Sequence, residues 1–124
     1  MYTLLGRATP HPLFTLFDAP DGTRACTRRL RSNTPLQALM LLNDEAFVEF
    51  ASALAARTIA EKKTDADRLD KIFRAGLARS PDPDERDRMQ RLLRQQRDAG
   101  KSDVAAWTTL ARVMLNLDEF ITRA

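Results

Sequence analysis

Apolar residues after Thr34 recur at intervals of three and four positions, the spacing that places them on one face of a helix. Each such stretch is preceded by a residue that can accept a hydrogen bond from the first helical turn. These residues are Thr34, Asp44, Thr64 or Asp65, Asp82 and Ser102. The sequence therefore predicts helices over residues 35–42, 45–62, 66–79, 83–98 and 103–117. We expect an all-α fold, an irregular helical bundle of about five helices.

The predicted helices differ in how much of their surface is apolar, and this difference predicts their place in the bundle. Residues 36–42 are apolar all round, and residues 104–115 leave few polar positions, so we expect both helices to be central and buried. Trp107 lies on the second of them and is expected in the core. Residues 83–98 are charged on most sides, with a narrow apolar stripe of Met89, Leu92 and Leu93. We expect a solvated outer helix there, with the stripe as an alternative docking face.

The first 33 residues have a different pattern. They contain Pro10, Pro12 and Pro20, and they hold only one apolar turn, residues 12–17 (PLFTLF). Residues 18–22 (DAPDG) combine Asp, Pro and Gly, which together favour a tight turn. We expect residues 1–33 to form an extended, proline-containing N-terminal arm with an Arg-rich loop, in the same domain as a bundle of residues 34–124.

The composition fits one soluble globular domain. The 124 residues are 44% hydrophobic and 30% charged, enough to bury a core without a metal or a disulfide. The 20 basic and 17 acidic residues give a net charge of only +3 and are interleaved on the predicted helices. Because nucleic-acid binding usually needs clustered, uncompensated charge, we expect no nucleic-acid partner. We also expect no membrane span, and residues 1–9 lack the layout of a signal peptide.

The segment Asp18–Arg31 is the main candidate for a ligand site, because it is polar, irregular and flanked by predicted helices. The planar guanidinium groups of Arg28 and Arg29 could clamp a carboxylate, sulfate or phosphate group. The structural alternative, which we favour, is that one of these arginines holds the loop on the bundle by pairing with Asp18, Asp21 or Asp44. The sequence identifies no particular small-molecule or glycan ligand.

Four further residues have both a functional and a structural interpretation. Asn43 and Asp44 interrupt an apolar helix, and they either cap helix ends, which we favour, or face a cleft with the Arg loop. Cys26 lies among basic residues that favour its thiolate, but a buried, unreactive thiol is the more frequent case. His11 is the only histidine, and one Cys with one His falls short of a usual zinc site. We therefore expect no metal and no cofactor in this chain.

Several sequence strings occur together in a fixed order: GRATPHPL, LFDAPDGTRACTRRLRSNTPLQALMLLNDEAFVEFASALAAR, GLARSPDPDE and LARVMLNLDEF. They resemble the C-terminal domain of unknown function 1553 of large Planctomycete-type bacterial proteins. The resemblance extends over essentially the whole chain, and its central block is far longer than a short motif. One departure is Glu45, which stands where many members have a proline after the LLND string.

The resemblance implies a larger parent protein. Members are long, exported, multi-domain proteins, and many carry an N-terminal cytochrome-c-like region. No C-x-x-C-H motif occurs here, so a haem-binding region would lie elsewhere in the parent. In the family the segment that begins with Tyr2 lies deep inside the domain, so we expect this chain to be a fragment whose partners are the missing N-terminal domains. The resemblance implies the periplasm or the cell envelope as its location; without it, the cytoplasm is the default.

Two classes of function remain open at this point. We favour a helical module that completes a larger envelope protein and has a structural or binding role. The alternative is part of an enzyme, with a redox or polysaccharide-related active site shared with the missing domains and with the Asp18–Arg31 loop and Asp44 contributing. These classes differ in one observable: whether Asp18, Arg28, Arg29 and Asp44 converge on an open pocket.

Overall fold

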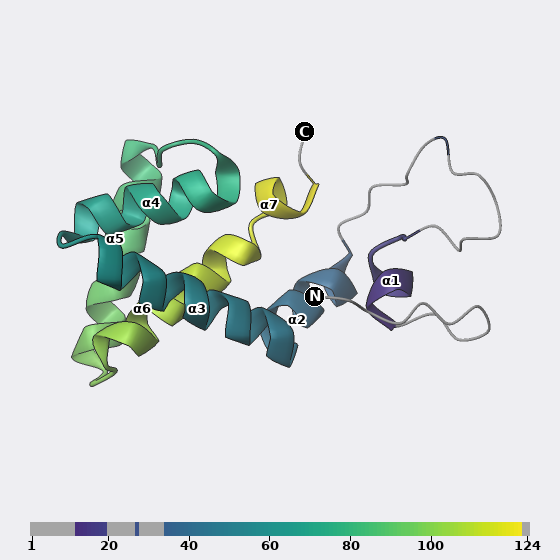
Figure 1. The fold of residues 1–124 in the computed structure, drawn as a ribbon, viewed down its shortest axis with the longest axis horizontal. Helices are drawn as coiled ribbons and strands as arrows, with labels where there is room; N and C mark the ends of the chain where they lie inside the picture. The colour runs from purple at the N-terminus through teal and green to yellow at the C-terminus, as the bar shows by residue number, and fades with distance from the viewer. Residues whose placement is uncertain (1–11, 20–26, 28–33, 123–124) are drawn as a thin grey trace.

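A computed structural model describes residues 12–19, 27 and 34–122, and in these ranges every regular element is a helix (Figure 1). This confirms the predicted all-α fold. The five longer helices match the five predicted ones, and a short helix flanks them at each end. In chain order the helices are α1 (Pro12–Leu16), α2 (Pro35–Asn43), α3 (Glu45–Glu61), α4 (Asp65–Leu77), α5 (Pro83–Asp98), α6 (Asp103–Leu115) and α7 (Asp118–Thr122).

The predicted capping residues begin the helices. The Thr34 side chain accepts from Gln37 N, and the Gln37 side chain accepts from Thr34 N, which forms a reciprocal capping box at α2. Asp82 begins α5 with the same reciprocal arrangement. Side chains also cap the other long helices, by Asp44, Thr64 and Ser102. At the end of α5, Gly100 adopts a φ of 78°, a left-handed conformation that glycine reaches without strain.

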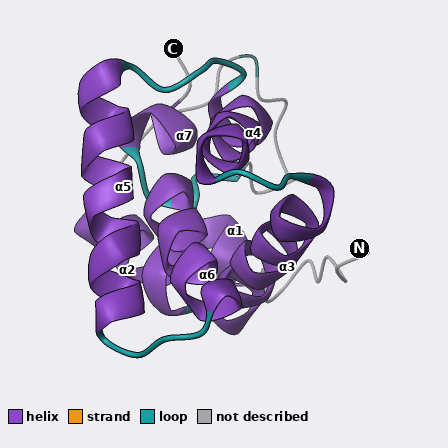
Figure 2. Ribbon diagram, turned by 90° about the vertical axis from the view of Figure 1, so that its left-hand side faces the viewer, coloured by secondary structure: helices purple, strands orange, loops and turns teal. Residues whose placement is uncertain are grey.

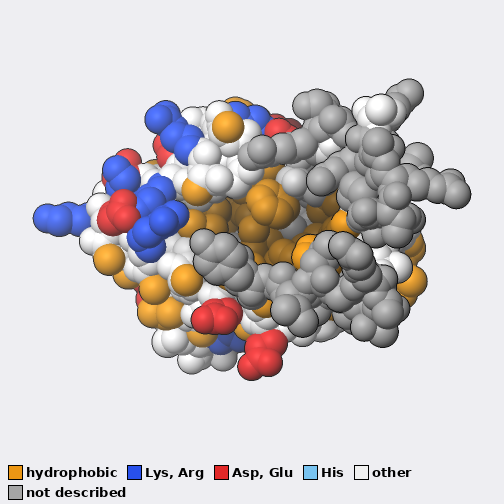
Figure 3. Space-filling view, turned by 45° about the vertical axis from the view of Figure 1, so that its right-hand side comes forward, with side chains coloured by type: hydrophobic (Ala, Val, Ile, Leu, Met, Phe, Trp, Pro, Cys, Tyr) orange, Lys and Arg blue, Asp and Glu red, His pale blue; other side chains and the backbone are white. Residues whose placement is uncertain are grey.

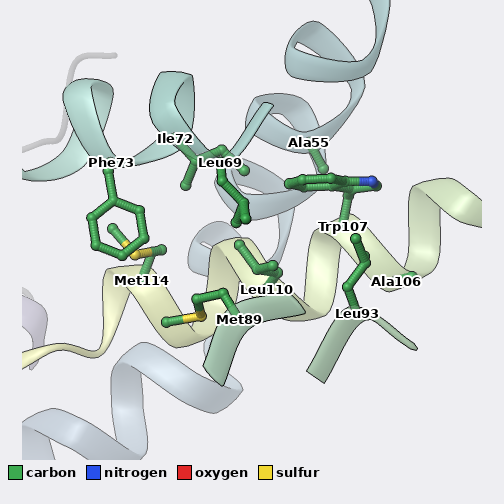
Figure 4. Packing of buried hydrophobic residues seen from close by; sticks show 10 residues of the cluster. All are labelled: Ala55, Leu69, Ile72, Phe73, Met89, Leu93, Ala106, Trp107, Leu110 and Met114. Carbon is green, nitrogen blue, oxygen red and sulfur yellow. The ribbon is translucent and has the colours of Figure 1, made fainter. Parts of the chain in front are cut away.

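Helix α6 lies at the centre of the bundle and packs against α2, α3, α4, α5 and α7, and Figure 2 shows it between α3, α4 and α5. Trp107 and Leu110 of α6 are fully buried, as predicted for this helix. Figure 4 shows Trp107 beside Ala55 of α3 and Leu93 of α5. The alanines of α3 that face inward, Ala51 and Ala55, are also fully buried. Their small side chains allow α3 to approach α6 closely.

The expectation that α2 is central and buried is wrong. Leu36 and Leu39 are 65% and 57% exposed, whereas the buried residues of α2 are Gln37 and Leu41. An apolar composition therefore did not determine the position of this helix. The polar Gln37 occupies an interior position because its side chain has hydrogen-bond partners there: besides its capping bond, Nε2 donates to Leu16 O at 2.7 Å.

The short terminal helices are attached to the bundle by specific contacts. The apolar turn at residues 12–17 does form a helix, α1, and the Phe17 ring lies 6.3 Å from the Phe47 ring of α3. At the other end, Asp118 and Glu119 follow the last of the long helices. They form the first turn of α7, where carboxylates interact favourably with the helix dipole.

Candidate functional site

The predicted site residues that the structure describes have local structural roles. Asp18 follows α1 with a φ of 52°, and the next amide, Ala19 N, donates to Phe14 O at 2.8 Å and closes the turn. Arg28, Arg29 and Cys26 lie outside the described residues, as does His11. Their convergence with Asp18 therefore stays a prediction.

Asp44 caps the ends of two helices, as we favoured, whereas Asn43 is the last residue of α2. Asn43 Nδ2 donates to Leu39 O at 3.0 Å within α2. Asp44 joins the two helices, because its N–H donates to Met40 O at 2.8 Å and its Oδ1 accepts from Ala46 N at 3.0 Å. Arg112 of α6 donates to the backbone oxygen of Leu42 at the same junction. This junction is thus a fixed corner between α2 and α3.

The most extensive polar cluster lies at the opposite end of the bundle, around Arg97. This arginine occupies the last turn of α5, and its guanidinium binds both oxygens of Asp65 at 2.7 and 3.1 Å. It also donates to Asp103 Oδ1 from Nη2 at 2.6 Å. Asp65 and Asp103 are the first residues of α4 and α6, so one side chain connects the ends of three helices.

Arg68 extends the Arg97 cluster towards the core. It donates to Asp103 Oδ2 at 3.0 Å and lies 3.6 Å from Asp65 Oδ1. Its guanidinium carbon is 5.8 Å from the centroid of the Trp107 ring, within the range of a cation–π interaction. Arginine therefore occupies the carboxylate oxygens of Asp65 and Asp103. We call such a group, in which one arginine joins helices through ion pairs, a clasp.

A second clasp is centred on Arg79, which follows α4. Its guanidinium binds Glu85 of α5 through two bonds of 2.7 Å and Glu119 of α7 through bonds of 2.7, 2.9 and 3.3 Å. Sequence analysis missed both clasps, because their partners are up to 40 residues apart. The only sequence signal was local. Acidic residues lie in the first turns of α4 and α6, and the basic Arg97 lies in the last turn of α5, as the helix dipole favours.

Acid should weaken both clasps. Hydrogen bonds from Arg97 lower the pKa of Asp65 below its usual value, and bonds from Arg79 lower the pKa of Glu85 and of Glu119. A folded-state pKa below the unfolded value means that the unfolded chain binds more protons at acidic pH. The free energy of unfolding should therefore fall as the pH is lowered from about 5 to about 3. Urea denaturation at a series of pH values measures this.

Arg97→Ala provides the matched test of the acid prediction. Because the ion pairs are half-exposed, the free energy of unfolding of the variant should be lower by roughly 1 kcal/mol at neutral pH. It should also show a shallower dependence of stability on pH between about 5 and about 3. Arg94→Ala removes the same charge from an exposed position of α5 and should behave like the wild type. Equal pH profiles for Arg97→Ala and the wild type would contradict the assignment of this pH dependence to the Arg97 clasp.

The exposed apolar side chains form a different kind of feature. Besides Leu36 and Leu39 on α2, the large exposed hydrophobic residues in the described part of the chain are Phe50 on α3, 47% exposed, and Val104 on α6, 45% exposed. Leu36 and Leu39 are neighbours on one face of α2, because residues three apart are adjacent on a helix surface. We call these two side chains the α2 apolar face.

Hydrophobic side chains gather on one side of the molecule. Figure 3 shows these hydrophobic side chains near the middle of the view. Charged side chains lie around this apolar area in the view, with basic ones gathered mainly at the left and acidic ones also below it. The distribution on this side is typical of a surface for apolar contact rather than for an ionic ligand.

Other kinds of site have less support among the described residues. Within residues 12–19, 27 and 34–122, no group of three or more His, Cys, Asp or Glu side chains is arranged to hold a metal ion. The described helices also include none that is both long and apolar enough to cross a bilayer.

Comparison with known proteins places the chain by its sequence. No curated protein and no solved structure matches it. Residues 1–93 match the model of one family, PSD1, which is described as a protein of unknown function (DUF1553). The match covers the N-terminal arm and α1 to α4 and most of α5, which is three quarters of the chain. The chain therefore belongs to the PSD1 (DUF1553) family.

Proposed function

We propose that this chain is a non-catalytic helical module that binds another part of a larger protein through the α2 apolar face. The observation that carries the proposal is the exposure of Leu36 and Leu39, 65% and 57%, on a helix that contains no charged residue (PLQALMLLN). An isolated exposed leucine is ordinary. A whole helix without charge at the surface is unusual, since surface helices carry charged residues on their outer face.

The energetic gain from covering this face is substantial. Full burial of a leucine side chain is favourable by roughly 1.5–3 kcal/mol relative to full exposure. The scaffold beneath the face is rigid, because α2 is fixed by the Thr34 capping box, by the Asp44 corner and by the hydrogen bond from Arg112. A face held in place in this way binds without a large ordering cost.

We infer that the partner is the N-terminal part of the parent protein. The family resemblance supports this choice, because members are long bacterial proteins in which further domains precede this one, and it also supports an exported location. A haem group, if the parent holds one, would lie in that part of the protein. The alternative, an active site shared with those domains, stays a prediction, because it depends on Arg28 and Arg29.

Binding between the module and the separately expressed N-terminal part of the parent tests the proposal. The double variant Leu36→Asp/Leu39→Asp should weaken binding in a calorimetric titration by at least about thirtyfold, as expected for anchor residues of an interface. Its thermal stability should change little, within about 0.5 kcal/mol, because the altered side chains are exposed in the module alone. Val104→Asp places the same charge at an exposed apolar site on α6 and should bind like the wild type.

Two results would overturn the proposal. The first is that the wild-type module does not bind the N-terminal part of the parent. The second is that Val104→Asp weakens binding as much as the α2 variant does, since the effect would then be one of added charge and not of the α2 apolar face.

A further inference from the structure

The C-terminal helix α7 depends on the rest of the bundle for its structure. It has five residues, and none of them is buried. So short a helix is not stable alone in water, because forming the first turn is unfavourable. Its backbone bonds include those from Phe120 N and Ile121 N to Leu117 O, at 3.0 and 3.1 Å.

Among the described residues, α7 contacts the bundle through both charged and apolar side chains. One contact is charged: Glu119 accepts hydrogen bonds from Nε and Nη2 of Arg79 at 2.9 and 2.7 Å. Another is apolar: a Cβ atom added at Gly76 of α4 would lie 3.9 Å from Cδ2 of Phe120 and 3.6 Å from Cε of Met114. The Phe120 ring therefore lies over a part of α4 that has no side chain.

Arg79 is held in position independently of α7. Both oxygens of Glu85 accept from it at 2.7 Å, and Glu85 is itself fixed because its Oε2 accepts from Asp82 N at 2.9 Å. The guanidinium carbon also lies 5.6 Å from the ring centroid of the fully buried Phe73. The guanidinium should therefore keep its position when Glu119 moves away.

The charged contact is open to solvent. The side chains of Arg79 and Glu119 are 36% and 48% exposed, so dissolved salt can screen their attraction. The packing of Trp107, Leu110 and Phe73 in the core is fully buried and is not weakened in this way. Salt also screens the ion pairs of Arg97 and the Arg79–Glu85 pair, but the buried packing still holds the longer helices together. Salt should therefore open α7 before it opens the bundle.

We propose that α7 is a releasable strap: the Arg79–Glu119 ion pair holds it over Gly76, and loss of that pair opens it while α2 to α6 stay folded. The open form leaves the Nε edge of Arg79 free for a carboxylate of another segment, and it uncovers the Gly76 surface beside Met114. This device is separate from the α2 apolar face, and it does not depend on the function proposed above.

Amide hydrogen exchange of the complete chain, followed by NMR, tests the strap. Salt raised from about 0.02 M to about 1 M shortens the screening length to about 3 Å. This change should speed exchange at Phe120 and Ile121 roughly two- to fivefold in the wild type. Glu119→Gln should show the faster exchange already at low salt and respond little to added salt. The Trp107 amide should keep the same protection throughout, which shows that the bundle remains folded.

Glu49→Gln is the matched control, because it makes the same chemical change at an exposed position of α3 away from Arg79. It should exchange like the wild type at Phe120 and Ile121. The strap is refuted if Glu119→Gln leaves these two amides as protected as in the wild type. It is also refuted if Trp107 loses protection together with them, because α7 would then open only with the whole bundle.

Discussion

Replacement of Trp107 by alanine is expected to lower the free energy of unfolding by about 3–5 kcal/mol, the usual cost of truncating a large buried aromatic side chain. Trp107 is fully buried in α6 and packs against α3 and α5 (Figure 4). The alanine variant removes this shared contact and also the ring on which Arg68 lies. Since domains are stable by about 5–15 kcal/mol, the loss is a large part of the total.

Trp107→Phe separates the loss of packing from the loss of the indole N–H. The Nε1 atom is buried and donates to no acceptor among the described residues. Its removal therefore costs no hydrogen bond. The free energy of unfolding of the phenylalanine variant should fall by only about 1–2 kcal/mol. Urea denaturation of both variants, with the exposed Val104→Ala as control, measures the difference. Equal losses for the phenylalanine and alanine variants would contradict the packing account.

Gln37→Ala is expected to destabilise the chain by about 1–3 kcal/mol, although the residue lies on the peripheral helix α2. Its side chain is 1% exposed, and its hydrogen bonds include one from Thr34 N to Oε1 at 2.8 Å and one from Nε2 to Leu16 O at 2.7 Å. Alanine would leave Thr34 N and Leu16 O without these hydrogen bonds. It would also detach α1 from α2, which faster amide exchange in α1 would reveal.

Gln37→Glu distinguishes the two bonds. A carboxylate still accepts from Thr34 N, so the capping box at α2 is kept, but it cannot donate to Leu16 O. The glutamate variant should therefore keep α2 intact and lose the attachment of α1. If it instead behaves like the wild type in both helices, the bond between Gln37 and Leu16 contributes nothing to the position of α1.

The sequence predicted the helices well because their signals are local. A capping side chain and the amide it binds are two or three residues apart, so Thr34, Asp44, Thr64, Asp82 and Ser102 can be recognised without tertiary information. The central position of α6 was predictable for a related reason: its apolar residues surround the helix, and Trp107 is too large to be left exposed at low cost.

The same reasoning failed for α2, which is as apolar as α6 but lies at the periphery. An apolar helix can be covered either by its own bundle or by another part of the protein, and sequence periodicity does not distinguish these cases. The Arg97 and Arg79 clasps were missed for a different reason. Ion pairs between helices depend on how the helices are packed, and an arginine that binds two carboxylates resembles an ordinary solvated arginine in the sequence.

The candidate ligand site was predicted only in part. The capping role of Asp44 followed from its position between two apolar stretches and is confirmed. Asn43 instead lies inside α2, where its side chain donates to Leu39 O. The partners of Arg28 and Arg29 depend on the path of a loop that has no periodic pattern. The surroundings of Cys26 depend on the path of the same loop. The anion site of the Asp18–Arg31 loop therefore stays a prediction.

Thiol labelling at position 39 shows whether the α2 apolar face is covered by another part of the protein. Leu39→Cys in a Cys26→Ser background introduces one cysteine on the α2 apolar face, and Val104→Cys in the same background provides an exposed control on α6. In the isolated module both cysteines should react rapidly with a maleimide. In the presence of the N-terminal part of the parent, the account predicts that Cys at position 39 is protected while Cys at position 104 still reacts. Rapid labelling at both positions in the assembled protein would contradict the account.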